Sequence, residues 1–185
     1  MPEASEPSIY EKTFAKTDET DAILVVQGKK LHVNKALLSI HSDFFKTLFN
    51  SEFKEKSMEE IEIKDVKFED FAILLSVIGP NPILPDEYKA EKLLELADRF
   101  LLTAAKRHLE LFICSTQMDT FKKLKIAEKY DLDVLLENAV ALHTSHYDFE
   151  EIYRKVDEFS DRTKSKLFKR YFYLVDCNQI RLITP

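Results

Sequence analysis

The residue types that could bind a metal ion gather in the last third of the chain. His143 and His146 lie three positions apart, and Asp148 follows. Imidazoles and carboxylates are ligands of zinc and iron, but a stable site needs more of them in a closed geometry. No further cluster of ligand types accompanies these three residues. We therefore predict that they are structural, and that the protein has no metal site and no cofactor.

The sequence also lacks the patterns that enzymes and nucleic-acid-binding proteins require. With only two glycines, it has little room for a loop that cradles phosphate. Its formal net charge of −6 gives no electrostatic support for binding a phosphate backbone. We predict neither catalysis nor nucleic-acid binding. The candidate nucleophiles lie outside any Gly-x-Ser-x-Gly setting; they are Ser39, Ser42 and Ser115.

Three consecutive residues, Phe53, Lys54 and Glu55, are the best candidates for binding another protein. They lie in a stretch, 50–57, that is too polar to form a core. An exposed aromatic ring beside a carboxylate offers a partner an apolar anchor and a charge that fixes orientation. We predict that the ring of Phe53 is exposed. The alternative is that it is buried under the following loop.

The elements that must position these residues begin with a β-hairpin. The apolar run Ile23–Val26 is rich in β-branched residues, ends at Gln27-Gly28 and resumes at Leu31–Val33. Two such runs separated by a glycine-containing break are typical of two antiparallel strands. The whole stretch 21–55 thus starts with a hairpin and predicts an α+β unit.

Two helices are predicted to follow the hairpin. The first is short, and Ser42 then occupies the N-cap position of the second, where its hydroxyl can accept a bond from a free backbone N–H. The apolar residues of the first helix are Ala36, Leu37 and Ile40, and those of the second are Phe44, Phe45, Leu48 and Phe49. We expect at least two of Phe44, Phe45 and Leu48 to pack in the core.

These residues resemble the BTB/POZ domain, and in particular the BTB proteins abundant in nematodes. The resemblance rests on Asp21-x-Ile-Leu-Val-Val, the glycine turn, Leu31-His-Val-Asn-Lys-Ala-Leu-Leu-Ser39, His41-Ser-Asp-Phe-Phe45 and Leu48-Phe49. It extends from about residue 17 to about residue 114. Asn34 stands where many BTB domains have histidine, so no role of that ring is carried over. The implied fold is a small β-sheet flanked by helical hairpins, within a mostly helical α+β protein.

The resemblance also implies partners. BTB adaptors of cullin-three ubiquitin ligases carry a hydrophobic-x-Glu motif where this chain has Phe53, Lys54 and Glu55, with Phe45 and Leu48 on the same surface. BTB domains also place an acidic and a basic residue near their dimer interface. The matching residues here are Asp21 and Lys35, an expected ion pair, with Phe14 nearby; the alternative is two solvated charges.

The chain after residue 59 is predicted to be mainly helical. Residues 60–64 alternate between polar and apolar, which favours a strand. Asp65 could cap the helix that follows, which ends at Gly79-Pro80-Asn81-Pro82 because proline cannot continue a helix. The apolar residues of that helix are expected on one face: Phe68, Phe71, Ala72, Leu75 and Ile78.

An internal repeat of thirty residues dominates the next part. Lys92–Phe112 aligns without a gap on Lys122–Leu142, and the candidate caps Thr103 and Asp133 fall in the same register. We predict two helical hairpins, each packed on its neighbour. Asp148–Glu151 matches a capping box for a further helix. The last helix is predicted to begin at Ser160.

We therefore expect four regions. Residues 1–16 are a tail with a possible first strand at Ile9–Ala15, 17–115 are the BTB/POZ domain, and 116–173 are a helical extension similar to the BACK or three-box regions of BTB adaptors. Residues 174–185 are a tail that could be a strand, a frayed end or a tag remnant. The lead-in is too short and too strand-like for the dimerising helix that many BTB domains carry, which leaves the dimer geometry open.

Composition suggests where such a protein acts. The N-terminal residues lack the basic and apolar regions of a signal peptide, and no apolar run approaches the ~20 residues of a membrane helix. Cys114 and Cys177 have no metal or redox spacing, which favours reduced thiols. We expect a soluble, intracellular protein, cytoplasmic or nuclear, with no separate substrate-binding domain in this sequence.

The functional hypothesis is a non-enzymatic BTB adaptor. It would self-associate, as a homodimer, bind a cullin-three scaffold protein, and present an unknown substrate for ubiquitin-dependent degradation. The alternative is a BTB scaffold for oligomerisation or co-repressor recruitment without any ligase.

Overall fold

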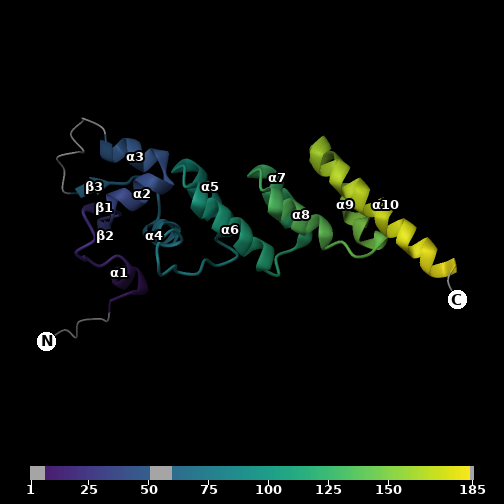
Figure 1. Cartoon of the computed structure of the whole chain (residues 1–185), viewed down its shortest axis with the longest axis horizontal. Coiled ribbons are helices and arrows are strands. Elements are labelled where there is room, and N and C mark those ends of the chain that lie inside the picture. The colour runs from purple at the N-terminus through teal and green to yellow at the C-terminus, as the bar shows by residue number, and fades with distance from the viewer. Residues whose placement is uncertain (1–6, 51–59, 184–185) are drawn as a thin grey trace. The chain divides into compact units, whose positions relative to one another are not determined.

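The computed structural model describes residues 7–50 and 60–183 of the chain (Figure 1). These residues belong to two compact units, Met1–Leu109 and Glu110–Pro185, which are considered separately. Within the described residues, no helix combines the length and the apolar character needed to cross a bilayer.

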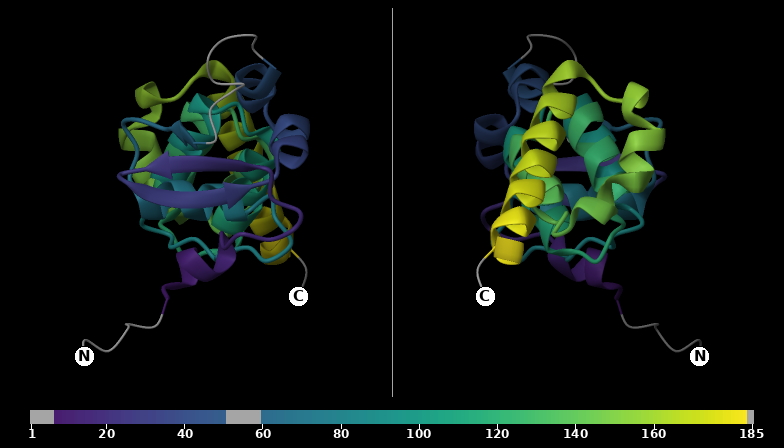
Figure 2. Two further views of the ribbon diagram at one scale, coloured as in Figure 1. Left: turned by 90° about the vertical axis from the view of Figure 1, so that its left-hand side faces the viewer. Right: turned by 90° about the vertical axis from the view of Figure 1, so that its right-hand side faces the viewer.

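The N-terminal unit is built around the predicted β-hairpin. Strands β1 (Ala22–Val26) and β2 (Lys29–Val33) pair antiparallel in a register that places Val26 opposite Lys29. The two-residue turn has positive φ at both positions, 50° at Gln27 and 76° at Gly28. Such a turn matches the right-handed twist of the strands that it joins. The hairpin prediction is confirmed, and Figure 2 shows its two strands side by side.

A third strand completes the sheet. Strand β3 (Glu60–Glu62) pairs parallel to β1, which gives the order β2-β1-β3. Its burial alternates as predicted, with Ile61 buried between two exposed glutamates. Because β1 and β3 run in the same direction, the chain between them must cross over, and it does so through two helices.

The predicted first strand is instead a helix. Residues Ile9–Thr13 form α1, which begins with a capping box in which Ser8 and Glu11 bond to each other's backbone N–H groups. Phe14 follows the helix, and its carbonyl accepts a bond from His32 N at 3.2 Å. The local cap therefore prevails over the extended pattern that the apolar residues suggested. With five residues, α1 is as short as the sequence implied.

The N-terminal unit continues with the helices α2 (Lys35–His41), α3 (Asp43–Asn50), α4 (Phe68–Ser76) and α5 (Ala90–Arg99). Helix α4 is the central one, since every residue except Glu69 is buried. The prediction placed its apolar residues on one face, but the helix is buried on all sides. Asp65 does not cap it either; the side-chain oxygen of Gln27 accepts from Phe68 N at 3.0 Å.

The thirty-residue repeat is structural. Helices α5 and α6 (Thr103–Ser115) form one hairpin, and α7 (Thr120–Lys129) and α8 (Asp133–Ala141) form another. Thr103 and Asp133, the predicted caps, are instead the first residues of α6 and α8, so each lies one position inside its helix. In both hairpins the equivalent positions are buried: Leu94 and Leu124, Leu96 and Ile126, Ala97 and Ala127, Phe100 and Tyr130, Leu102 and Leu132.

The C-terminal unit ends in a long helix. A 3₁₀ helix (His146–Phe149), α9 (Glu150–Arg154) and a second 3₁₀ turn (Val156–Glu158) lead to α10 (Asp161–Ile183). The capping box lies earlier than predicted, at Ser145 and Asp148. The residues expected to form a C-terminal tail continue α10 as far as Ile183.

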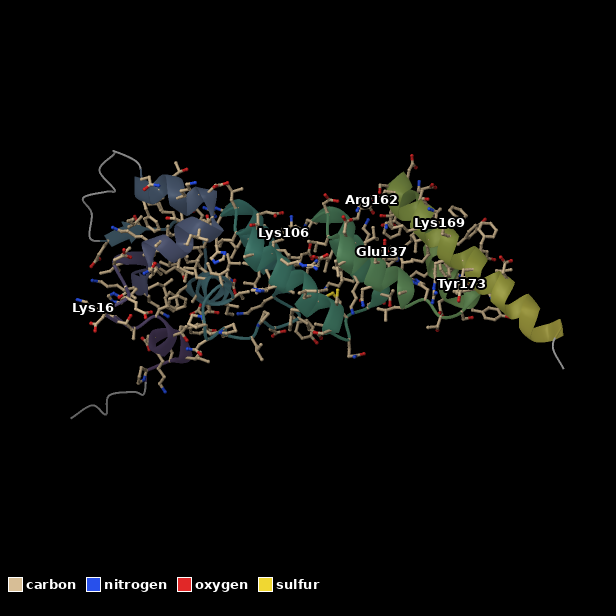
Figure 3. All side chains as sticks on the ribbon, in the orientation of Figure 1. Lys16, Lys106, Glu137, Arg162, Lys169 and Tyr173 are labelled. Carbon is tan, nitrogen blue, oxygen red and sulfur yellow. The ribbon has the colours of Figure 1, made fainter. Side chains whose placement is uncertain are left out.

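Cationic residues attach α10 to the preceding hairpin at successive turns. Arg162 pairs with Asp131 and Asp133, and Lys166 pairs with Glu137. One turn further, the guanidinium of Arg170 donates to the carbonyls of Ala141 and His143 at the end of α8. A cation there also complements the helix dipole. Figure 3 shows Arg162 and Glu137 in this region.

Candidate protein-interaction surface

The corner between α2 and α3 is fixed by Ser42. Its hydroxyl accepts a bond from Phe45 N at 3.1 Å, which caps α3 as predicted. The same hydroxyl donates to the carbonyl of Phe100 at 2.6 Å. Ser42 is buried, so both bonds are shielded from water. One side chain thus orients α3 and connects it to the end of α5.

An aromatic cluster holds the inner side of α3. The ring of Phe45 stacks on those of Phe49 and Phe100, with centroids 5.8 and 5.9 Å apart, and also contacts Phe71. Phe45 has no exposed surface. The prediction that it contributes to a partner-binding surface is therefore wrong, because this ring is the centre of the core. Phe44 and Leu48 are half-buried, and the ring of Phe44 packs edge-on against those of Phe45 and Phe100.

The outer side of α2 and α3 differs from the expected pattern. Leu38 is the buried residue of α2, whereas Ile40, one of the apolar residues on which the prediction of this helix rested, is 77% exposed. Asn34 sets the phase of the helix, since its side-chain oxygen accepts from Leu37 N at 2.8 Å. The exposed residues of α3 are Asp43, Lys46, Thr47 and Asn50. Ile40 is thus an exposed apolar residue that the helical pattern alone did not identify.

The predicted cullin-binding motif, Phe53, Lys54 and Glu55, lies outside the described residues. It follows directly in sequence from α3, so the residues that lead into it are those of that helix. Leu48, also predicted to bind the cullin, lies within α3.

The predicted pair of Asp21 and Lys35 is in contact, but not as an ion pair. The carboxylate of Asp21 accepts a bond from the backbone N–H of Lys35 at 2.7 Å. It therefore caps the first turn of α2, and a negative charge there complements the helix dipole. Phe14 is buried, so its ring belongs to the unit's own core. A role of these residues in a dimer interface stays a prediction.

Two buried charged residues of the C-terminal unit escaped the prediction. Glu110 accepts bonds from Val134 N and Leu135 N at 2.7 and 3.0 Å, and so caps α8 from another helix. The ammonium of Lys123 donates to the carbonyls of Cys114 and Thr116, which closes the end of α6. The repeat could have indicated both, because the equivalent positions thirty residues away are apolar. Val140 corresponds to Glu110, and Leu93 corresponds to Lys123.

Two of the residues considered as metal ligands, His143 and Asp148, make structural contacts. His143 is buried, with Nδ1 3.0 Å from the carbonyl of Ala139 and its ring against Phe149. The carboxylate of Asp148 accepts from the N–H groups of Thr144 and Ser145, each at 2.8 Å. These bonds lower the pKa of Asp148. Among the described residues, no group of three potential ligands converges on one point.

Comparison with known proteins decides the family. The profile of the BTB/POZ domain matches residues 10–117. The chain belongs to the BTB/POZ domain family. The match covers more than half of the sequence, ends within the linker between α6 and α7, and so contains the sheet and the first of the two repeated hairpins. The predicted fold class, α+β and mostly helical with a BTB core, is confirmed.

Several nematode BTB proteins are similar to the chain. The chain is 40% identical over 131 residues to BTB and MATH domain-containing protein 36 of Caenorhabditis elegans, which covers 69% of this chain and 41% of that protein. It is 32% identical to BTB and MATH domain-containing protein 38 over 173 residues, 90% of this chain and 44% of the relative. The chain thus spans less than half the length of these relatives.

A solved BTB domain is also similar. The structure of the BTB domain of human gigaxonin is 26% identical and covers 51% of this chain and 77% of its own, with a TM-score of 0.43.

Proposed function

We propose that this protein is a substrate adaptor of a cullin-three ubiquitin ligase and that its BTB domain self-associates. BTB domains are modules for protein–protein interaction, and this assignment follows from the family. The cullin is the further step. It is supported by the motif of Phe53, Lys54 and Glu55, which matches that of the adaptors in residue type and place.

The structure of α3 supports the same proposal. The inner side of the helix is fixed by the ring of Phe45 and the cap of Ser42, so the helix is a rigid support. Its outer side keeps Lys46, Thr47 and Asn50 exposed, with Leu48 half-buried at the edge. A partner helix can cover such a surface, whose apolar edge leads in sequence to Phe53. The helical hairpin α7–α8 would correspond to the region that enlarges the cullin contact in adaptors.

A binding experiment with matched variants tests the proposal. Wild type, Phe53→Ala, Leu48→Asp and the control Tyr88→Ala would be titrated with the amino-terminal half of a cullin-three protein. Tyr88 is 82% exposed and lies outside the proposed surface. Truncating a binding hot spot costs about 2 kcal/mol, which is a loss of about thirtyfold in affinity. We expect that loss for Phe53→Ala, a comparable one for Leu48→Asp, and none for Tyr88→Ala.

The same experiment separates the alternative function. If wild type does not bind the cullin at tens of micromolar, the ligase proposal is wrong, and a scaffold for oligomerisation or co-repressor recruitment remains. If wild type binds and Phe53→Ala binds equally well, the adaptor role stands and the assigned motif is wrong. Light scattering on the same samples measures self-association, which both functions require.

A further inference from the structure

The C-terminal unit contains an apolar groove that the proposed cullin contact does not use. The groove has a volume of about 480 Å³ and lies between α10 on one side and the 3₁₀ helix with α9 on the other. Aromatic and aliphatic side chains form most of its lining, chiefly Tyr147, Phe149, Ile152, Tyr153, Phe168 and Tyr171. Two of these, Tyr147 and Tyr153, are 78% and 82% exposed. Large aromatic rings exposed together are unusual on a surface that nothing covers.

An aromatic ridge on α10 borders this groove. Phe168 and Phe172 are one turn apart, and their rings stack with centroids separated by 6.4 Å. They are 53% and 60% exposed. Phe168 also lines the groove, so the ridge and the groove belong to one continuous face. A twofold interface uses the same patch on both copies, so an exposed apolar ridge of this kind can lie at its axis.

The charges beside the ridge indicate which partner binds this face. Lys169 precedes Phe172 by three residues and Asp176 follows it by four. Because seven residues make almost two helical turns, both charges lie on the same side of the ridge. Both are exposed, and within the described part of the chain neither has an ion-pair partner. The cations that face α8, Arg162 and Lys166, are by contrast paired. Figure 3 shows Lys169 further along α10.

We propose that this face binds the same face of a second copy of the chain, with the two α10 helices antiparallel and the twofold axis near Phe172. In that arrangement the two Phe172 rings meet at the axis. Lys169 of each copy lies level with Asp176 of the other, so the pairing forms two intermolecular ion pairs from four charges that are otherwise unpaired. The antiparallel arrangement also opposes the two helix dipoles favourably.

The size of the face is sufficient for a specific but weak contact. Large aromatic residues bury about 150–250 Å² each. The four exposed rings of this face therefore offer on the order of 500 Å² per copy; they are those of Tyr147, Tyr153, Phe168 and Phe172. The total of about 1,000 Å² is at the lower limit of biological interfaces. The contact is therefore expected to be dynamic and dependent on concentration. It is separate from self-association through the BTB domain and does not depend on cullin binding.

Charge reversal on the full chain tests the pairing. In sedimentation equilibrium, Lys169→Asp and Asp176→Lys should each weaken the association at least tenfold, because each creates two like-charge contacts. The double variant Lys169→Asp/Asp176→Lys restores both pairs in the opposite sense and should return to within about threefold of wild type. Lys16→Asp reverses an exposed charge in the N-terminal unit and serves as the control, with no change expected. Any association through the BTB domain is common to wild type and all four variants.

Disulfide formation gives a second, geometric measurement. In a background with Cys114 and Cys177 replaced by serine, a chain with Lys169→Cys mixed with a chain with Asp176→Cys should form a crosslinked dimer under mild oxidation. Each chain carries a single cysteine, so every disulfide that forms joins two chains. Each single-cysteine chain alone should crosslink much less.

The outcomes are decisive in both directions. Loss in the single variants, recovery in the double variant and crosslinking of the mixture support the proposed pair. Unchanged association in Lys169→Asp and Asp176→Lys would overturn it, and so would a double variant that stays as weak as the singles. In either case the groove would bind a different protein or would have no partner.

Discussion

Leu101 and Asp131 lie thirty residues apart and share the same φ angle of 51°. Each is the residue after the C-cap of a helix, α5 or α7. Around each, two backbone bonds recur: the residue itself donates to a carbonyl three positions back, and the next residue donates to one five positions back. This is the Schellman motif, whose left-handed residue is most often glycine. The repeat therefore conserves a backbone turn, in both cases without the residue that suits it best.

Leu101→Gly should consequently stabilise the protein. A non-glycine residue in the left-handed region costs roughly 1–2 kcal/mol, which exceeds the entropy that glycine loses on folding. Leu101 is half exposed, so little burial is lost. We expect a gain of about 1 kcal/mol in the free energy of unfolding, measured by urea denaturation, and a loss of similar size for Leu101→Val. Leu84→Gly, at an exposed leucine with ordinary φ, should give no gain; equal gains at both sites would contradict the assignment.

Glu110→Val should destabilise the C-terminal unit. Valine occupies the equivalent position of the second hairpin, so the substitution fits the apolar pattern of the repeat. It removes the acceptor that Glu110 provides to Val134 N and Leu135 N, and unsatisfied buried donors cost about 1–3 kcal/mol. We expect a loss of about 2 kcal/mol by urea denaturation.

Glu110→Gln is the matched control for this substitution. Its side-chain oxygen can still accept both bonds, so it should retain most of the stability. If valine is tolerated as well as glutamine, the cap contributes nothing.

The features that could be predicted from the sequence are those set by neighbouring residues. The hairpin follows from Gln27-Gly28, and the start of α3 follows from Ser42, because each residue acts on backbone within a few positions. The repeat was visible because its two copies share a buried pattern without a gap. The motif at Phe53 came from the family resemblance and stays a prediction.

The features that were missed depend on the tertiary structure. All four apolar residues of α3 recur at helical spacing, and only packing against Phe71 and Phe100 decides that Phe45 is the central one. The buried charges of Glu110 and Lys123 are satisfied by backbone groups of other elements, so their own neighbours give no sign of it. A comparison of the two repeat copies would have revealed both, since each has an apolar equivalent.

Phe45→Ala and Phe53→Ala should separate the core from the proposed binding surface. Phe45 is fully buried among aromatic rings, and removing such a ring costs about 3–5 kcal/mol. We expect that loss of stability for Phe45→Ala, measured by chemical denaturation. Phe53→Ala should change the stability by less than about 0.5 kcal/mol, as expected for a surface position, while it weakens cullin binding. A large loss of stability for Phe53→Ala would place its ring in the core and remove the proposed anchor.

Asp148 should make the stability of the C-terminal unit depend on pH at acidic values. Backbone N–H groups of Ser145 and Thr144 hold the pKa of its carboxyl below the usual value. A lowered pKa means that the stabilisation is complete above about pH 4, the unfolded-state value, and is lost as the pH falls through the folded-state value. Asp148→Asn should therefore cost about 0.5–1 kcal/mol at pH 7, the lower part of the range for helix caps, because the carboxylate is exposed. Thermal unfolding from pH 7 to pH 2.5 should show the two proteins converging as Asp148 becomes protonated; a difference that persists at pH 2.5 would mean that its charge is not the cause.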